Sequence, residues 1–112
     1  MPNSNPHIDE IAVGSQVTEC LYSDAHSFTV VRKTAKAIFI KMDNQEIDRD
    51  NWKPDITPGG FSGHCNNDWS QKWIVSANPD AGERMVRTGR DGKLSRKARY
   101  ILGSHPHYDH NF

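Results

Sequence analysis

Three short segments near the start of the chain alternate apolar and polar side chains, and this pattern limits the fold more than any other feature. They cover residues 15–23, 26–34 and 36–43, and the second, HSFTVVRKT, is rich in the β-branched and aromatic residues that favour strands. The connections between them are very short, so the spacing predicts an antiparallel meander. We therefore predict an all-β domain, a small barrel or SH3-like antiparallel sheet of about six strands.

The strand signal returns in the second half of the chain, where residues 70–77 alternate again. Alternate side chains of this segment share one face, namely Gln71, Trp73 and Val75. The Asn-Pro-Asp-Ala-Gly turn at 78–82 predicts that a strand over 83–88 returns antiparallel to it. A second turn at 89–92 predicts another hairpin, and residues 94–102 fit either a last strand or a short helix with a serine cap.

Residues 43–69 form a long connection, DNQEIDRDNWKPDITPGGFSGHCNNDW, that has neither a helical nor a strand period. It is dense in Asp, Asn, Gly and Pro, and it is far longer than the usual connection of about 4–6 residues. Trp52, Phe61 and Trp69 supply aromatic anchors that disordered segments lack. We therefore predict one long ordered loop packed across an end of the β domain, and loops of this kind often carry function.

Size and composition predict one thin-cored domain. The chain has 112 residues, of which 35% are hydrophobic, and its mean hydropathy is −0.79. Residues 1–13 are polar and rich in turn formers, so we predict a flexible N-terminal tail followed by a single β domain over 14–112. The thin core, together with three Trp and four Phe, predicts a homo-oligomer, most simply a dimer, with any ligand pocket near the interface and lined by residues 58–69.

Charge and cysteine content narrow the possible partners. The formal net charge is zero, so no overall field draws the chain to nucleic acid or to a membrane. Seven of the fourteen basic residues nevertheless fall between 84 and 99, where they form either a solvated strand face or an anion-binding face. The chain carries no secretory signal and no apolar run of about 20 residues, which predicts a cytoplasmic protein that spans no membrane. Cys20 and Cys65 are then expected to be reduced, without a disulfide or a Cys-only metal site.

The C-terminal sequence contains His105-x-His107-x-Asp109-His110, the spacing of the HxHxDH motif of metallo-β-lactamase-like hydrolases. Imidazoles and a carboxylate at that spacing bind zinc in those enzymes. Only two residues follow the motif here, which leaves no chain to complete a dinuclear site. We therefore predict no metal, no cofactor and no catalytic residues, and keep a metal-dependent hydrolase as the alternative that these four residues would serve.

Aromatic and basic side chains near the long loop suggest a ligand site. Small β folds hold nucleotides and single strands by stacking bases on aromatic rings beside arginines. A glycine-rich stretch at 58–63 allows a ligand to approach the backbone closely, although the same aromatics could equally fill the core. The candidate ligand-binding residues are Trp52, Phe61, His64, Asn67, Trp69, Arg84, Arg87 and Arg99.

Several short motifs resemble those of a family of small proteins encoded by phages and prophages. The matching stretches are Ser23-Asp24-Ala25-His26, Thr29-Val30-Val31, Lys53-Pro54, Pro58-Gly59-Gly60-Phe61, His64-Cys65, the 78–82 turn, and Tyr108-Asp109 with Asn111-Phe112. The resemblance covers nearly everything after residue 13 and implies a phage accessory protein in a bacterial cytoplasm. It provides no catalytic residues that could be carried over to this chain. The leading hypothesis is a non-enzymatic binding module that inhibits host defence by sequestering a nucleotide or blocking a defence protein. A nucleic-acid-binding accessory protein that uses the 84–99 face is the alternative.

Overall fold

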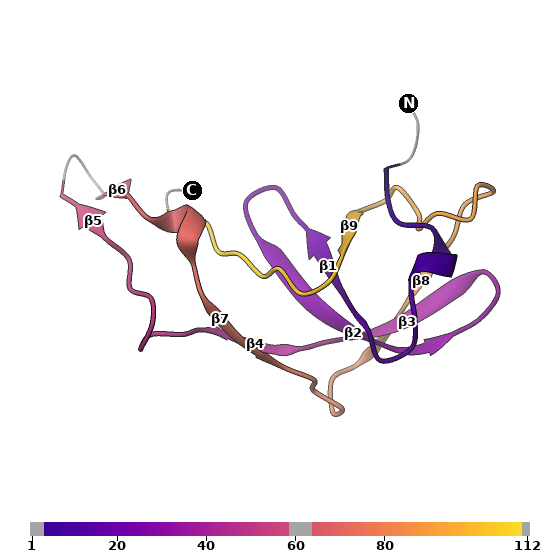
Figure 1. Cartoon of the computed structure of the whole chain (residues 1–112). Coiled ribbons are helices and arrows are strands. Elements are labelled where there is room, and N and C mark those ends of the chain that lie inside the picture. The colour runs from indigo at the N-terminus through magenta and orange to yellow at the C-terminus, as the bar shows by residue number, and fades with distance from the viewer. Residues whose placement is uncertain (1–3, 59–63, 111–112) are drawn as a thin grey trace.

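The computed structural model describes residues 4–58 and 64–110, and it is all-β (Figure 1). Five strands form one antiparallel sheet in the order β8-β3-β2-β1-β9, and two further pairs form short ribbons, β4-β7 and β5-β6. The strands are β1 Gln16–Cys20, β2 Ala25–Lys33, β3 Ala37–Met42, β4 Asn44–Ile47, β5 Ile56–Thr57, β6 His64–Cys65, β7 Trp73–Ser76, β8 Glu83–Arg87 and β9 Arg99–Leu102. Two single-turn 3-10 helices, η1 Ile8–Glu10 and η2 Asp68–Ser70, complete the described chain. The all-β prediction is confirmed, with an open sheet edged by β8 and β9 and no closed barrel.

The predicted meander is confirmed in β1, β2 and β3. Residue Val17 of β1 pairs with Phe28 of β2, and Val30 of β2 pairs with Ile40 of β3, so their side chains point to the same face. A register shift lies between Val30 and Arg32, and it bends the long strand β2. The alternation in the sequence therefore reports the buried face of the sheet correctly.

The hydrophobic core lies on the concave face of this curled sheet. Arg84 on β8 reaches Glu19 on β1 at 2.6 Å, although β3 and β2 separate these strands in the sheet. Three strand spacings amount to about 14 Å in a flat sheet, so the contact requires strong curvature. The fully or nearly buried side chains of the core are Ile8, Ile11, Val17, Phe28, Val30, Ile38, Ile40, Val86, Leu94 and Tyr100.

The N-terminal segment is part of this core, and the prediction of a flexible tail before Gly14 is wrong for the described residues 4–13. Ile8 and Ile11 are only 4% and 1% exposed. Asn5 is also buried, and its side-chain amide donates to the carbonyl oxygens of Ser95 at 2.9 Å and Ala98 at 2.8 Å. The strands of the open sheet do not cover one end of the core, which is called the mouth of the sheet below. The side chains of Asn5, Ile8 and Ile11 fill this end.

Strand pairing in the second half differs from the predicted hairpins. The turn at 78–82 forms, but it joins β7 and β8, which pair with β4 and β3 respectively. The turn at 89–92 also forms, yet β8 and β9 lie at opposite edges of the sheet, and residues 94–98 are neither strand nor helix. Val86 pairs with Ile38 across β8 and β3, so burial of an apolar pair far apart in sequence decides the arrangement.

The long connection 43–69 is more structured than predicted, since it contains β4, β5, β6 and η2. Figure 1 shows the β4-β7 ribbon leading away from the curled sheet to a small lobe that carries β5, β6 and η2, beside the C-terminal segment. The lobe is built around Trp52, which is 6% exposed. No helix in the described ranges has the length and apolar character needed to cross a lipid bilayer.

A polar layer covers the outer face of β1 and β2. Thr18, Ser27 and Asp43 are all at most 5% exposed. The Ser27 hydroxyl donates to an Asp43 carboxylate oxygen at 2.6 Å, and the Gln16 amide donates to the same oxygen at 3.0 Å. Thr29 donates to the other oxygen of Asp43. The C-terminal segment packs over this layer, because the Thr18 hydroxyl bonds the Gly103 carbonyl at 2.8 Å.

Candidate functional site

An open cleft of about 560 Å³ lies between β7 and the C-terminal segment. Two indoles contribute to it, and its lining residues are Gln16, Trp69, Gln71, Trp73, Val75, Ser104, His105, Pro106 and His107. One wall is the face of residues 71, 73 and 75 that the alternating sequence predicts, and this prediction is confirmed.

The other wall is the C-terminal segment, which backbone hydrogen bonds fix to the sheet. His107 forms an antiparallel bridge with Ala25, with N–O distances of 2.9 and 3.0 Å. The His105 backbone N–H donates to the Thr18 hydroxyl at 2.8 Å. These contacts hold a non-periodic segment in a defined path, so the cleft is preformed.

Gln71 sets the geometry of the cleft wall formed by residues 71, 73 and 75. The oxygen of its side-chain amide accepts hydrogen bonds from the Trp73 indole N–H and from the Tyr108 backbone N–H, both at 3.0 Å. Its amide nitrogen donates to Asp68 at 2.6 Å and to the Tyr108 carbonyl. One side chain therefore joins β7, η2 and the C-terminal segment and orients the Trp73 ring.

Trp69, in contrast, is 85% exposed although it lines the cleft. An indole is the largest apolar side chain, and leaving it in water forgoes a favourable burial of about 150–250 Å². A scattered exposed apolar side chain is ordinary on protein surfaces, but an exposed indole at the wall of an aromatic cleft offers a stacking platform.

A cluster of potential metal ligands lies beside the cleft. The Nδ1 atom of His110 is 2.7 Å from one oxygen of Asp68, and the Nε2 atom of His107 is 3.5 Å from the other. Cys65 lies next to them, and its thiol sulfur, the Asp68 oxygen and the His110 nitrogen are all within 4.8 Å of one another. Partial burial works against ionisation of Asp68, but hydrogen bonds from His110 and Gln71, with the charge of His107, lower its pKa below the usual value.

Of the described loop residues predicted to bind a ligand, only Trp69 lines the cleft. Trp52 is buried in the lobe, with its indole N–H 3.2 Å from the Ser70 hydroxyl, and Asn67 holds the loop by donating to the Lys53 carbonyl at 2.9 Å. Both residues build the site without lining it. His64 is exposed on β6, outside the cleft lining, and Phe61 lies outside the described residues.

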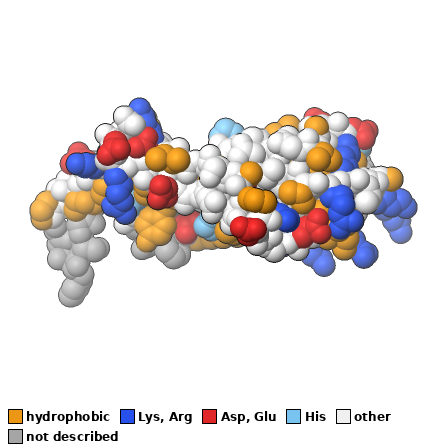
Figure 2. Space-filling view, turned by 90° about the horizontal axis from the view of Figure 1, so that it is seen from below, with side chains coloured by type: hydrophobic (Ala, Val, Ile, Leu, Met, Phe, Trp, Pro, Cys, Tyr) orange, Lys and Arg blue, Asp and Glu red, His pale blue; other side chains and the backbone are white. Residues whose placement is uncertain are grey.

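None of the three predicted arginines lines the cleft. Arg84 pairs with Glu19 and stacks 4.7 Å from the centre of the Phe28 ring, inside the curl of the sheet. Arg87 is on edge strand β8 and Arg99 is on the opposite edge strand β9, so the predicted basic strand pair does not form. On the face shown in Figure 2, basic side chains are spread over both ends with acidic side chains among them, rather than gathered in one patch.

Burial and hydrogen bonding within the curled sheet also favour the neutral phenol of Tyr100 over its ionised form. Burial, followed by the charge of Glu19, raises the pKa of Tyr100 to about 12. Its phenol donates to Glu19 at 3.0 Å. Glu19 is therefore shared by Arg84 and Tyr100, and Arg84 is a structural residue of this group.

The HxHxDH residues do not converge on one point. His105 is an exposed residue of the cleft wall, while His107 and His110 turn towards Asp68. The Asp109 backbone N–H donates to the side chain of Asp24, in the turn between β1 and β2.

Several cleft residues carry no signal in the sequence, since they lie in the non-periodic C-terminal segment or on β1. They are Gln16, Ser104 and Pro106. The sequence does carry a signal for the cluster of Cys65, Asp68, His107 and His110. Cys65-x-x-Asp68 and His107-x-x-His110 are two pairs of potential ligands at the three-residue spacing common in zinc sites.

No family model, curated protein or solved structure matches this chain.

Proposed function

We propose that this protein is a non-enzymatic binding module whose cleft holds a planar heteroaromatic group, such as the base of a nucleotide. The observation that carries the proposal is the exposed Trp69 indole at a cleft that has the fixed Trp73 ring in one wall. Stacking of a base on an aromatic side chain contributes about 1–3 kcal/mol and tolerates every base.

Polar groups at the cleft suit the edge of a base. The Gln16 amide nitrogen is used by Asp43, which leaves its carbonyl oxygen as an acceptor. Ser104 donates its hydroxyl proton to Ser27 at 2.8 Å, so its oxygen is also an acceptor toward the cleft, and His105 adds a ring nitrogen. No Lys or Arg is among the described residues that line the cleft, which favours recognition of the base over recognition of phosphate.

The resemblance to phage-encoded proteins supplies the biological setting of this proposal. A module of this size in a bacterial cytoplasm would act by sequestering a nucleotide signal of the host or by blocking a host defence protein. Nucleic-acid binding through the basic residues 84–99 is less well supported, because β8 and β9 do not form the strand pair that this hypothesis predicted. A hydrolase that uses the HxHxDH motif is likewise less well supported, because its residues diverge.

Replacing Trp69 by Ala is expected to weaken binding of a nucleoside or nucleotide by roughly 5- to 150-fold, since about 1–3 kcal/mol of stacking is removed. Isothermal titration against a panel of nucleosides and of cyclic and linear nucleotides measures the change. Tyr22→Ala is the matched control, because Tyr22 is an aromatic residue that is 94% exposed and lies outside the cleft. Absence of binding across the whole panel, or equal binding by the Trp69 variant, would contradict the proposal.

We also propose that the protein forms a homodimer. β8 is an edge strand, and Met85 on it is 45% exposed next to its partner Phe39 on β3. A second copy that covers this region would bury apolar surface and protect the edge. Light scattering at micromolar concentration is expected to give a mass near twice 12.7 kDa, and a mass near 12.7 kDa itself would show a monomer.

A further inference from the structure

We propose that Cys65, Asp68 and His110, joined by His107, bind a zinc ion that fastens the lobe to the C-terminal segment. The ligand atoms of the first three residues lie within 4.8 Å of one another, and His107 approaches the second oxygen of Asp68 at 3.5 Å. This site adjoins the base-binding cleft, because His107 also lines the cleft, but it is argued from a different set of contacts.

The distances suit a tetrahedral ion after small side-chain adjustments. Zinc bonds of about 2.0–2.3 Å place two ligand atoms of a tetrahedral site about 3.3–3.8 Å apart. The separation between His110 and Asp68 is 2.7 Å, that between His107 and Asp68 is 3.5 Å, and the Cys65 sulfur lies within 4.8 Å of its neighbours. Changes on the order of 1 Å, within the reach of side-chain rotation, bring the Cys65, Asp68 and His110 donors to these values. A larger rotation brings in His107, which lies outside that group of three, as the fourth donor.

The chemical types of the donors select the metal. A thiolate and two imidazoles with one carboxylate are the ligands that zinc prefers, whereas calcium and magnesium prefer sets made of oxygen. The two pairs, Cys65-x-x-Asp68 and His107-x-x-His110, each place their ligands three positions apart and come from segments far apart in the sequence. This arrangement, one pair from each of two segments, is the usual construction of a structural zinc site.

Neighbouring side chains are placed to orient the ligands. Gln71 donates to the Asp68 carboxylate at 2.6 Å. The ring of His110 packs against Trp52, with ring centres 5.3 Å apart, and its edge faces Tyr108 at 4.9 Å. Such outer contacts fix ring orientation and exclude water, which raises the affinity of a metal site.

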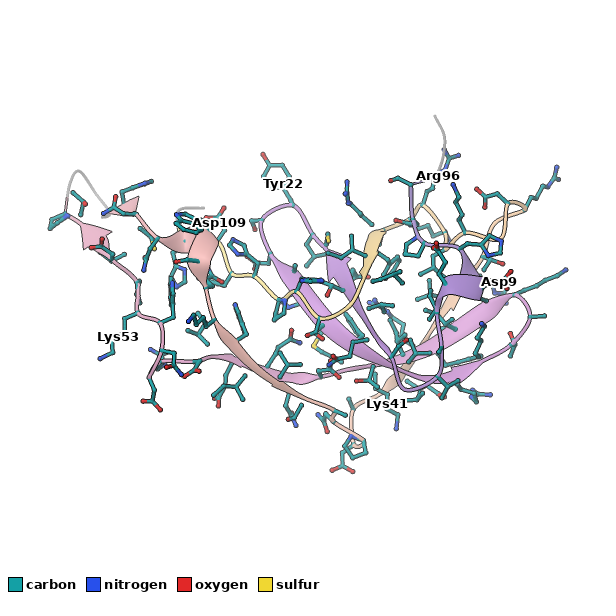
Figure 3. All side chains as sticks on the ribbon, in the orientation of Figure 1. Asp9, Tyr22, Lys41, Lys53, Arg96 and Asp109 are labelled. Carbon is teal, nitrogen blue, oxygen red and sulfur yellow. The ribbon has the colours of Figure 1, made fainter. Side chains whose placement is uncertain are left out.

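The lobe also has a physical need for a cross-link. Of its described residues between 48 and 72, only Trp52 and Cys65 are buried, and its strand pair β5-β6 has two residues in each strand. Units with so small a core commonly depend on a metal or a disulfide. Figure 3 shows Asp109, in the C-terminal segment, beside the ribbon of η2, which is the junction that the ion would close.

Metal binding is tested on the full chain, purified without a histidine tag and stripped with a chelator. Titration with Co²⁺ is expected to give one equivalent of binding and a sulfur-to-cobalt charge-transfer band. Added Zn²⁺ should displace the cobalt and raise the thermal midpoint. The substitution Cys65→Ser, which is close in size, should abolish the charge-transfer band, and His110→Ala should weaken zinc binding at least tenfold.

Cys20→Ser is the matched control, because Cys20 is the other cysteine and lies on β1, outside the cluster. Far-ultraviolet circular dichroism of each variant shows whether the β fold is retained. The proposal is overturned if the band is absent, if Cys65→Ser keeps it, or if zinc leaves the thermal midpoint of the parent protein unchanged. Nucleotide titration of the same samples reports separately on the cleft, so the two proposals can fail independently.

Discussion

Replacing Asp43 by Ala is expected to lower the free energy of unfolding by about 2–5 kcal/mol, because it leaves three hydrogen-bond donors without their acceptor. Asp43 is 5% exposed and accepts from Ser27 at 2.6 Å, from Gln16 at 3.0 Å and from Thr29. Ser27 is fully buried, so water cannot replace the lost carboxylate there. A buried network of this kind loses stability sharply when one shared acceptor is removed.

Urea unfolding at neutral pH measures this change as a shift of the midpoint at an unchanged slope. Asp43→Asn should lose less than Asp43→Ala, since the amide keeps one acceptor oxygen for Ser27 or Thr29. Glu46→Ala on the adjacent strand β4 is the control, because Glu46 is an exposed carboxylate whose removal should cost at most about 0.5 kcal/mol. Equal stabilities for the Asp43 and Glu46 variants would refute the role assigned to the polar layer.

Replacing Leu94 by Ala is expected to cost about 2–5 kcal/mol, through lost burial and the cavity that remains. Leu94 is fully buried between the N-terminal segment and the curled sheet, and its backbone N–H donates to the Pro6 carbonyl at 3.0 Å. The sheet is open at this mouth and the core is small, so few neighbouring side chains are available to fill the space.

Leu21→Ala provides a control with the same chemical change, because Leu21 is 51% exposed. Its stability should remain within about 0.5 kcal/mol of the parent protein. Thermal and urea unfolding of both variants compare the two sites directly. If Leu94→Ala lowers the free energy of unfolding by less than about 1 kcal/mol, Leu94 does not fill the open end of the core as described.

Both predictions concern the curled five-stranded sheet and the segments packed on it, which together carry the cleft. The polar layer around Asp43 holds Gln16, which lines the cleft, and Ser27, which bonds Ser104 of the opposite wall. The lobe supplies Trp69. The cleft therefore lies where the curled sheet, the ribbon and the C-terminal segment meet, and a change in any of them is expected to alter binding.

The sequence by itself determined the all-β class, the meander and the buried face of its strands. Val17, Val30 and Ile40 follow a period of two within single strands, so their burial is a local property that alternation reports. The same reasoning identified the face of residues 71, 73 and 75 that forms one wall of the cleft. Turn chemistry also located the reversals at 78–82 and 89–92.

Only the tertiary structure decided which strands pair and which distant residues meet. β4, with the sequence NQEI, has no apolar period, and it becomes a strand because β7 offers hydrogen-bonding groups that must be paired. Ile8 and Ile11 are buried because the open sheet leaves a mouth, which no local pattern can indicate. The Cys65–Asp68 and His107–His110 pairs are readable as spacings, but their meeting depends on the bridge between His107 and Ala25. Contacts of this kind bring together segments that are far apart in the sequence, which costs conformational entropy. Burial of apolar surface and hydrogen bonds elsewhere in the protein offset that cost, so neither segment alone can indicate the contact.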